Sequence, residues 1–163
     1  YDVVLLDISM PGRSGLEILE EIVGHRPRLP VLILSMHPEE QYAVRALRAG
    51  AAGYLTKASA PQELIGAIRK VSRGGKYVTA SLAEKLALEL DLGAQKQRHE
   101  TLSNREYQVM LMLAWGKSVG EIASELSLSV KTVSTYRSRV MEKMGMKKNA
   151  ELTLYAVNNH LLS

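Results

Sequence analysis

Residues 117–133 read KSVGEIASELSLSVKTV, and this stretch decides the fold of the second half of the chain. Apolar residues at helical spacing predict one short helix over residues 119–126. A serine-rich tight turn is predicted at residues 127–129, and a second helix over residues 130–144. The inner stripe of the first helix consists of Ile122, Ala123 and Leu126. Because Ala123 is small, the two helices can cross steeply, as a helix-turn-helix requires.

The second predicted helix, which Ser129 caps, carries apolar and polar residues on opposite sides. Its inner side is formed by Val133, Val140 and Met144. Its outer side is formed by short polar and basic residues: Lys131, Thr132, Ser134, Thr135, Arg137 and Ser138. Such a face suits the major groove of DNA, where side chains reach donors and acceptors on the base edges.

Two further helices complete a predicted all-α, four-helix domain over residues 101–163. One is predicted over residues 101–114, with Ser103 as its N-cap and Glu106 completing a capping box. The last is predicted over residues 150–162. Three large apolar residues are predicted to lie in the core and not in a cofactor site: Met110, Met112 and Trp115.

The charge of the chain is uneven. The 163 residues carry a net charge of +4, but residues 1–92 balance 11 basic against 11 acidic side chains. Residues 93–163 hold 10 basic against 6 acidic side chains and supply the whole excess. A basic segment on a neutral chain favours a polyanion as partner, nucleic acid first, although a solvated helix face has the same composition.

Composition also excludes several kinds of site. The chain has no cysteine, which excludes disulfides, thiolate metal sites and cysteine nucleophiles. No apolar run approaches the roughly 20 residues that cross a bilayer, and the first residues show no signal-peptide pattern. We therefore expect a cytoplasmic protein with no membrane contact. No combination of nucleophile and base suggests a dedicated enzyme.

Residues 102–145 resemble the LuxR-type helix-turn-helix of NarL/FixJ-type response regulators. The family pattern of Leu-Ser/Thr-x-Arg-Glu, Gly-x-Ser, Glu-Ile-Ala, Leu-x-x-Ser and Lys-Thr-Val is present without gaps. The resemblance implies that base edges are reached by Ser134, Thr135 and Ser138, with Arg137 nearby. It implies that DNA phosphates are held by Lys131, Thr132, Tyr136 and Lys143. Hydroxyl residues replace the Lys or Arg of many relatives at the base-reading positions, so the operator sequence stays open.

The first half of the chain alternates strands and helices. Short apolar runs predict strands over residues 3–6, 31–34 and 53–56. Each strand is followed by an apolar stripe at helical spacing, within residues 16–22, 42–47 and 64–71. This order predicts an α/β domain whose parallel sheet is built from right-handed crossovers.

Three polar residues stand at or just beyond the carboxyl ends of these strands: Asp7, Ser35 and Lys57. Chemistry in open α/β sheets collects at this edge. An aspartate there can accept a phosphoryl group as a carboxylate nucleophile, and a lysine and a hydroxyl can bind the new oxygens. Each residue alone also has an ordinary explanation, such as a turn-capping Asp or a surface Lys.

Together with Tyr54, these residues resemble the receiver domain of response regulators. Asp-x-x-Met-Pro-Gly begins at Asp7, and the other residues match at family spacing. The resemblance implies that Asp7 is the phosphoacceptor and that Ser35 and Lys57 bind the phosphoryl group. It implies that Tyr54 is the aromatic side chain that swings inward on activation. Ala58 stands where the family usually has Pro.

Against the strand order 2-1-3-4-5 of a flavodoxin-like receiver, the chain begins at the third strand. The family's Mg²⁺ is bound by acidic residues after the first strand together with the phosphoacceptor, and Asp2 lies too far along its strand to replace them. We therefore expect Asp7 to be the one metal ligand here, no Mg²⁺ to be bound, and phosphotransfer to be deficient. The strand at 3–6 is patterned as a central strand, so either a preceding segment or another chain must cover its edge.

The prediction for the whole chain is an α/β receiver, in part, followed by an all-α helix-turn-helix domain. The domains are the C-terminal part of a receiver over residues 1–80 (strands 3–5 of the family fold), a linker helix and linker over 81–100, and the DNA-binding domain over 101–163. The predicted function is a DNA-binding transcription regulator of a two-component system, switched in the parent protein by Mg²⁺-dependent phosphorylation of the receiver aspartate. Its predicted partners are double-stranded promoter DNA, a sensor histidine kinase and a second copy, paired through the C-terminal helix and the receiver.

Two alternatives remain open. The first is a phosphorylation-independent DNA-binding regulator with a vestigial receiver. The second is a protein-docking or phosphorelay module without a DNA role. Salt-dependent binding to promoter DNA separates the second alternative from the others.

Overall fold

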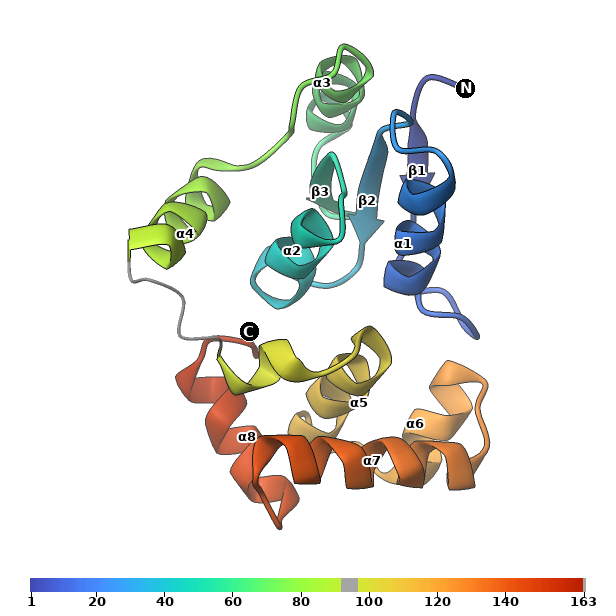
Figure 1. Cartoon of the computed structure of the whole chain (residues 1–163), viewed down its shortest axis with the longest axis vertical. Helices are drawn as coiled ribbons and strands as arrows, with labels where there is room; N and C mark the ends of the chain where they lie inside the picture. Colours follow the sequence, from blue (N-terminus) through green and yellow to red (C-terminus); the bar gives the residue numbers. More distant parts are fainter. Residues whose placement is uncertain (92–96, 163) are drawn as a thin grey trace. The chain divides into compact units, whose positions relative to one another are not determined.

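The computed structural model describes residues 1–91 and 97–162. The chain divides into two compact units, Tyr1–Leu92 and Gly93–Ser163, and each unit has its own core. The first unit is α/β and the second is helical (Figure 1). The predicted fold classes of the two halves are confirmed.

A parallel sheet of three strands forms the centre of the first unit. Its strands β1 (Val4–Leu6), β2 (Val31–Ser35) and β3 (Gly53–Thr56) lie in the order β1-β2-β3. Val4 pairs with Val31, and Leu32 pairs with Gly53. The helices of this unit are α1 (Gly15–His25), α2 (Glu39–Arg48), α3 (Pro61–Ser72) and α4 (Ala80–Asp91). Consecutive strands lie side by side because each returns through a helix, as the alternating pattern predicts.

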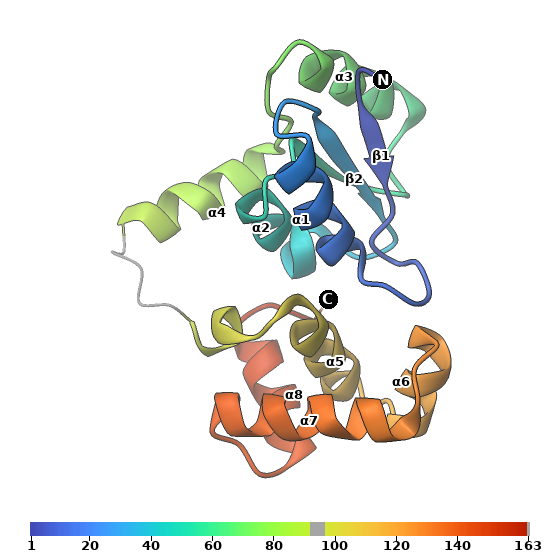
Figure 2. The same ribbon diagram turned by 45° about the vertical axis from the view of Figure 1, so that its right-hand side comes forward.

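Helices cover both faces of this sheet. On one face, Ala67 of α3 packs against Leu32 and Leu55. Helices α1 and α2 lie on the opposite side of the strands from α3 (Figures 1 and 2). The central strand β2 is therefore buried almost throughout, which explains its continuously apolar sequence.

Strand β1 lies at the edge of the sheet within the part of the chain that the structure describes. Its middle residue, Leu5, is 47% exposed, although its neighbour Leu6 is buried. An apolar residue on an open edge is the feature that the sequence predicts for this strand.

The second unit consists of a 3₁₀ helix η1 (Arg98–Thr101) and four α-helices. These are α5 (Asn104–Ala114), α6 (Val119–Leu126), α7 (Val130–Met144) and α8 (Asn149–Asn158). Ser103 and Glu106 form the predicted capping box at the start of α5, and the Ser129 side chain accepts from the Thr132 N–H at the start of α7. The bounds predicted for α6 and α7 are confirmed.

Three details of the helical half were predicted wrongly. Helix α5 begins at Asn104 and not at residue 101, because Thr101 ends η1 and Ser103 is the N-cap. Helix α8 ends at Asn158, not at residue 162, since His160 has a positive φ of 54°. Trp115 is 54% exposed and does not lie in the core, whereas Met110 is fully buried and Met112 partly so.

The predicted linker over residues 81–100 begins as helix α4, and residues 92–96 lie outside the described residues. Its last residues belong to η1, which packs on the helical unit. The Arg98 guanidinium donates to the Met144 carbonyl at 3.2 Å, and the His99 Nδ1 lies 2.9 Å from the Tyr155 hydroxyl. These contacts attach residues 98 and 99 to the ends of α7 and α8.

Candidate functional site

Asp7 follows β1 directly, and Lys57 follows β3. Their side chains form an ion pair of 2.5 Å between Nζ and Oδ2, and both remain partly exposed. The Asp7 Oδ1 accepts from the Ser9 N–H at 2.7 Å. Burial alone would raise the pKa of Asp7, but the Lys57 ammonium and the Ser9 N–H outweigh it and hold this pKa below its ordinary value. The carboxylate is therefore ionised at neutral pH and has the charge that a nucleophile needs.

Ser35 and Tyr54 lie on neighbouring strands, and both of their side chains form hydrogen bonds to the backbone of one residue, His37. The buried Ser35 Oγ accepts from the His37 N–H at 3.0 Å, and the Tyr54 hydroxyl donates to the His37 carbonyl at 3.0 Å. Burial raises the pKa of the Tyr54 phenol well above its ordinary value, so the hydroxyl stays a proton donor. The Tyr54 ring points into the unit and is only 1% exposed.

The loop after Asp7 is held close to helix α1 by Gly15. A Cβ at this position would overlap the Ile8 Cα and stand 2.8 Å from the Asp7 carbonyl oxygen. Only glycine permits this approach, so Gly15 sets the path of the chain beside Asp7. Gly15 was not among the predicted site residues, although a glycine at the first residue of a helix was a visible signal.

The described residues near Asp7 do not by themselves form a magnesium site. Both carboxylate oxygens of Asp7 already have partners, the Ser9 N–H and the Lys57 ammonium. Among the described residues, no three His, Cys, Asp or Glu side chains are grouped so that they could hold a metal ion. Protein sites for Mg²⁺ usually combine one or two carboxylates with waters and substrate phosphates, so further carboxylates would be needed here.

In the helical unit, α6 and α7 form the predicted helix-turn-helix. Ser127 adopts the left-handed conformation, with φ 55° and ψ 43°, and the Leu128 N–H closes the turn on the Ala123 carbonyl at 2.9 Å. The three residues of the α6 inner stripe are buried, as are Val133, Val140 and Met144 of α7. The turn thus fixes α7 across the end of α6, with its other side free of the core.

The predicted base-reading residues of α7 differ in how far they are exposed. Ser134, Thr135 and Ser138 are exposed, whereas Arg137 is half-buried. The Arg137 Nε donates to the Asn149 Oδ1 at 3.0 Å, which ties this guanidinium to the start of α8. The Thr135 hydroxyl donates to the carbonyl of Lys131 at 3.1 Å.

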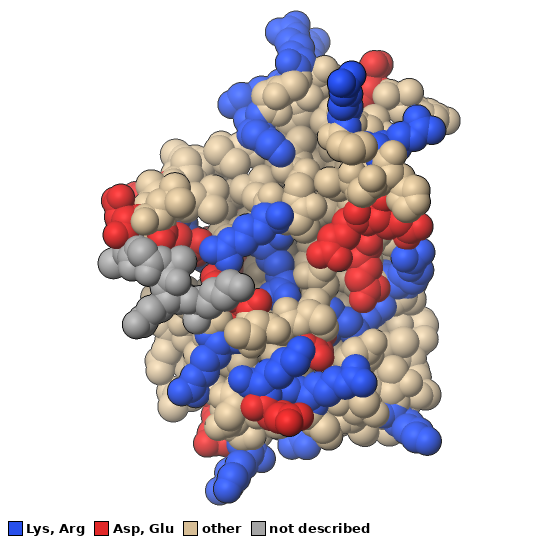
Figure 3. Space-filling view, in the orientation of Figure 1, with Lys and Arg blue, Asp and Glu red and all other residues tan. Residues whose placement is uncertain are grey.

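The predicted phosphate-binding residues also differ among themselves. Lys131 is exposed, Thr132 and Tyr136 are half-buried, and the Thr132 Oγ1 lies 2.8 Å from the capping Ser129 Oγ. Lys143 forms an ion pair of 2.7 Å with Glu106, whose side chain is 5% exposed. Figure 3 shows basic side chains spread over the visible face of the helical unit, with acidic side chains among them.

Glu106 connects three parts of the helical unit. Its Oε2 accepts from the Lys143 ammonium at 2.7 Å and from the Ser103 N–H at 2.9 Å. Burial alone would raise the pKa of Glu106, but Lys143 and Ser103 outweigh it and hold this pKa below its ordinary value of 4.5. The pair therefore joins the N-terminus of α5 to the last turn of α7.

Two exposed apolar residues lie one turn apart on α8. Leu154 is 63% exposed and Val157 is 53% exposed. The Thr153 hydroxyl donates to the Ala114 carbonyl at 3.0 Å, which attaches α8 to the end of α5. The other side of α8 is thus held by the unit through Leu152 and Ala156, while Leu154 and Val157 face outward.

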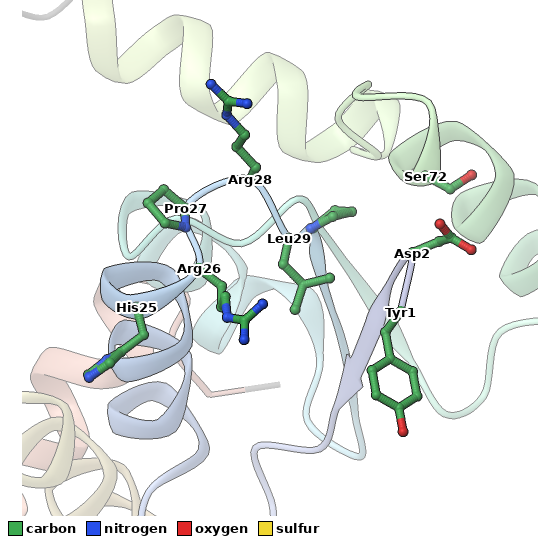
Figure 4. Close-up of a pocket in the computed structure, with 9 residues that line it drawn as sticks. Tyr1, Asp2, His25, Arg26, Pro27, Arg28, Leu29 and Ser72 are labelled. Atoms are coloured by element: carbon green, nitrogen blue, oxygen red, sulfur yellow. The ribbon is translucent and has the colours of Figure 1, made fainter.

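A cavity, whose lining is drawn in Figure 4, lies before the first residues of β1 and β2, whereas Asp7 follows the last residue of β1. It is lined by Tyr1 and Asp2 before β1, by His25 at the end of α1 and residues 26–30 that follow it, and by Ser72 at the end of α3. It contains none of the predicted site residues, because these collect at the carboxyl ends of the strands.

Comparison with known proteins identifies similar sequences for both units. Residues 1–69 match the response regulator receiver domain, and residues 100–156 match the bacterial regulatory proteins of the luxR family. The response regulator UvrY of Escherichia coli is 40% identical over 161 residues, which are 98% of this chain and 74% of that protein. The response regulator GacA of Pseudomonas aeruginosa is 39% identical over 165 residues, which are 99% of this chain and 76% of that protein.

A solved structure is similar over both units. It is RcsB from Salmonella enterica serovar Typhimurium bound to promoter rprA in the presence of the phosphomimetic BeF3−. The TM-score is 0.54 at 26% identity, with 94% of this chain and 74% of that chain covered. Among residues 1–91 and 97–162 of the present chain, no helix is long and apolar enough to cross a membrane.

Proposed function

Because the chain belongs to the NarL/FixJ-type two-component response regulators, which join a receiver to a LuxR-type DNA-binding domain, we propose that Asp7 accepts the phosphoryl group and that α7 reads the DNA. The observation that carries the first part is the convergence of Asp7 and Lys57 in an ion pair from two different strand ends. The second part is supported by the exposed polar face of α7 beyond the turn at Ser127.

In the proposed reaction, a carboxylate oxygen of Asp7 attacks the phosphorus of the donor. A new P–O bond forms, the bond between phosphorus and the donor breaks, and its electron pair leaves with the donor. Lys57 then exchanges its carboxylate contact for a phosphoryl oxygen, and the Ser35 hydroxyl donates to another. Receiver domains generally use Mg²⁺ for phosphorylation, where it neutralises phosphoryl charge. The natural donor is a sensor histidine kinase, and we expect the chain itself to have no dedicated enzymatic activity.

The phosphoacceptor is tested by the intact mass of the chain after incubation with acetyl phosphate and Mg²⁺. Because the described residues near Asp7 lack the further carboxylates that Mg²⁺ would need, we expect slow addition of one phosphoryl group to the wild type and none to Asp7→Asn. Glu17→Gln, which removes a carboxylate from the first turn of α1, is the matched control and should behave like the wild type. A phosphoryl group retained by Asp7→Asn would contradict the assignment.

For DNA, Lys131 supplies charge to phosphates, whereas Ser134, Thr135 and Ser138 reach the base edges. Phosphate contacts fix affinity and its salt dependence, and base contacts fix sequence choice. The Arg137 guanidinium donates to Asn149 at the start of α8, so we assign Arg137 to the rim of this face, together with Tyr136 and Thr132. Lys143 keeps its proposed phosphate role only if DNA competes with Glu106 for its ammonium.

Fluorescence anisotropy with labelled promoter DNA tests this assignment. We expect Lys131→Ala to weaken binding to all sequences alike and to lower the slope of log affinity against log salt by about one. Ser138→Ala should change sequence preference and leave the slope unchanged. Arg69→Ala, which removes an exposed charge from α3, is the control for net charge. Equal salt slopes for Lys131→Ala and the wild type would contradict the phosphate contact.

The exposed apolar residues of α8 support pairing of two copies through this helix. Leu154 and Val157 would be buried against their counterparts, as in an isologous two-fold interface. We propose that pairing also involves the receiver, and that the protein acts on DNA in the cytoplasm. Leu154→Glu should abolish dimers in sedimentation experiments on the DNA-bound protein, whereas Leu90→Glu on α4 should not.

A further inference from the structure

Helix α7 carries one exposed apolar side chain. Val130, its first residue, is 56% exposed, whereas the other exposed residues of this helix are polar or charged. The helix does not need a valine there, because Ser129 caps it and the first backbone N–H has no partner within a helix. Core packing does not explain this residue either, since more than half of its surface is open.

Val130 belongs to the same surface as the residues that face DNA in the proposed function. Ser134 follows it by one turn, so the two side chains lie on one side of α7. Two nearby threonine hydroxyls already have partners in the helix or its cap. Thr135 donates to the Lys131 carbonyl, and the Thr132 and Ser129 hydroxyls are 2.8 Å apart. The start of α7 therefore presents an apolar side chain to the major groove, in which base pairs expose few apolar groups.

We propose that Val130 is a base-reading residue that packs against the 5-methyl group of a thymine. This inference rests on the proposed role of α7 as the DNA-reading helix. The N-terminal residues of such a helix contact base edges. The thymine methyl is the apolar group that base pairs present in the major groove, and an apolar side chain distinguishes it from cytosine and from uracil. Val130 thus adds a discrimination between bases that the hydroxyl side chains of α7 do not supply alone.

The test begins with selection of binding sites for the full chain from randomised duplex DNA. Each enriched thymine is then replaced by deoxyuridine, which lacks only the methyl group. At one thymine we expect the wild type to lose about fourfold in affinity, the effect of exposing one methyl group. Val130→Ala should bind the thymine and deoxyuridine sites equally. Ile65→Ala, an exposed apolar residue of α3, should keep the wild-type difference.

Val130→Thr keeps the β-branched shape and replaces one methyl by a hydroxyl, so it separates loss of the contact from loss of the helix. It should fold as the wild type does and discriminate less between the two bases. Unchanged discrimination by Val130→Ala would overturn the proposal, as would selected sites without any methyl-sensitive thymine. Absence of DNA binding by the wild type would instead overturn the proposed function on which it rests.

Discussion

Glu106→Gln should destabilise the helical unit by about 1–2 kcal/mol. Glutamine can still accept from the Ser103 N–H in a capping box, so the substitution removes mainly the charge that faces Lys143. The Glu106 side chain is 5% exposed and the Lys143 side chain is 42% exposed. The free energy of their interaction should therefore lie between that of an exposed ion pair and that of a hydrogen bond to a charged group. Exposed pairs contribute up to about 1 kcal/mol and hydrogen bonds to charged groups about 1.5–3 kcal/mol.

The assay is urea unfolding of the full chain followed by the fluorescence of Trp115. The chain has a single tryptophan, and it lies in the helical unit, so this signal reports that unit alone. Comparison of Glu106→Gln, Lys143→Met and the double variant gives the coupling free energy, which we expect to be about 1 kcal/mol. Ser103→Ala, which removes the cap but keeps both charges, should cost about 1 kcal/mol independently.

The same pair predicts how stability depends on pH. The pKa of Glu106 is lowered in the folded protein, so its contribution is complete above 4.5 and is lost as the pH falls below that value. The wild type should therefore lose more stability than Glu106→Gln on acidification through this range. Additive single variants, or equal acid sensitivity of wild type and Glu106→Gln, would refute the reasoning.

Three further substitutions test the supports of the two sites. Gly15→Ala should destabilise the α/β unit by about 2 kcal/mol through overlap with Ile8, whereas Gly24→Ala, with open space around it, should be neutral or stabilising in thermal unfolding. Ser127→Gly should stabilise the helical unit by about 0.5–1 kcal/mol, because glycine adopts a φ of 55° without strain; a loss of stability in urea would contradict this. Thr79→Val should increase hydrogen exchange in α4, since the Thr79 hydroxyl donates to Glu39 at 2.8 Å and accepts from the Leu82 N–H at 3.2 Å; unchanged exchange would show that these contacts do not hold the helix.

The elements of the chain were predictable where one local pattern determined them. The bounds of α6 and α7 agree with the sequence because caps and a turn enclose each helix. Trp115 was not predictable, since size and hydrophobicity favour burial while its actual position depends on where α5 ends. The start of α5 was placed too early, at Thr101, although Ser103 was correctly predicted as its N-cap, because Thr101 belongs to the 3₁₀ helix η1 that precedes the cap.

The residues of the two candidate sites also divide into those whose contacts the sequence predicts and those whose contacts it does not. Residue types at strand ends predict that Asp7 and Lys57 meet, because carboxyl ends of parallel strands share one edge. Other candidate site residues are restrained by partners that lie far away in the sequence. No rule of residue spacing predicts those partners. Glu106 engages Lys143 across 37 residues, and Asn149 engages Arg137 from the next helix.

Within the α/β unit, one continuous set of contacts leads from the strand ends to α4. Ser35 and Tyr54 hold the two backbone groups of His37, and Glu39 begins α2 two residues later. Its carboxylate accepts from Thr79, the residue before α4. A Ser35 that turned toward a phosphoryl group on Asp7 would release the His37 N–H and move the start of α2, so it would act on α4 through Glu39. Contact alone does not establish coupling, which requires that both ends bias one equilibrium. That equilibrium is measurable: phosphorylation should change hydrogen exchange in α4 of the wild type, and this change should disappear in Thr79→Val.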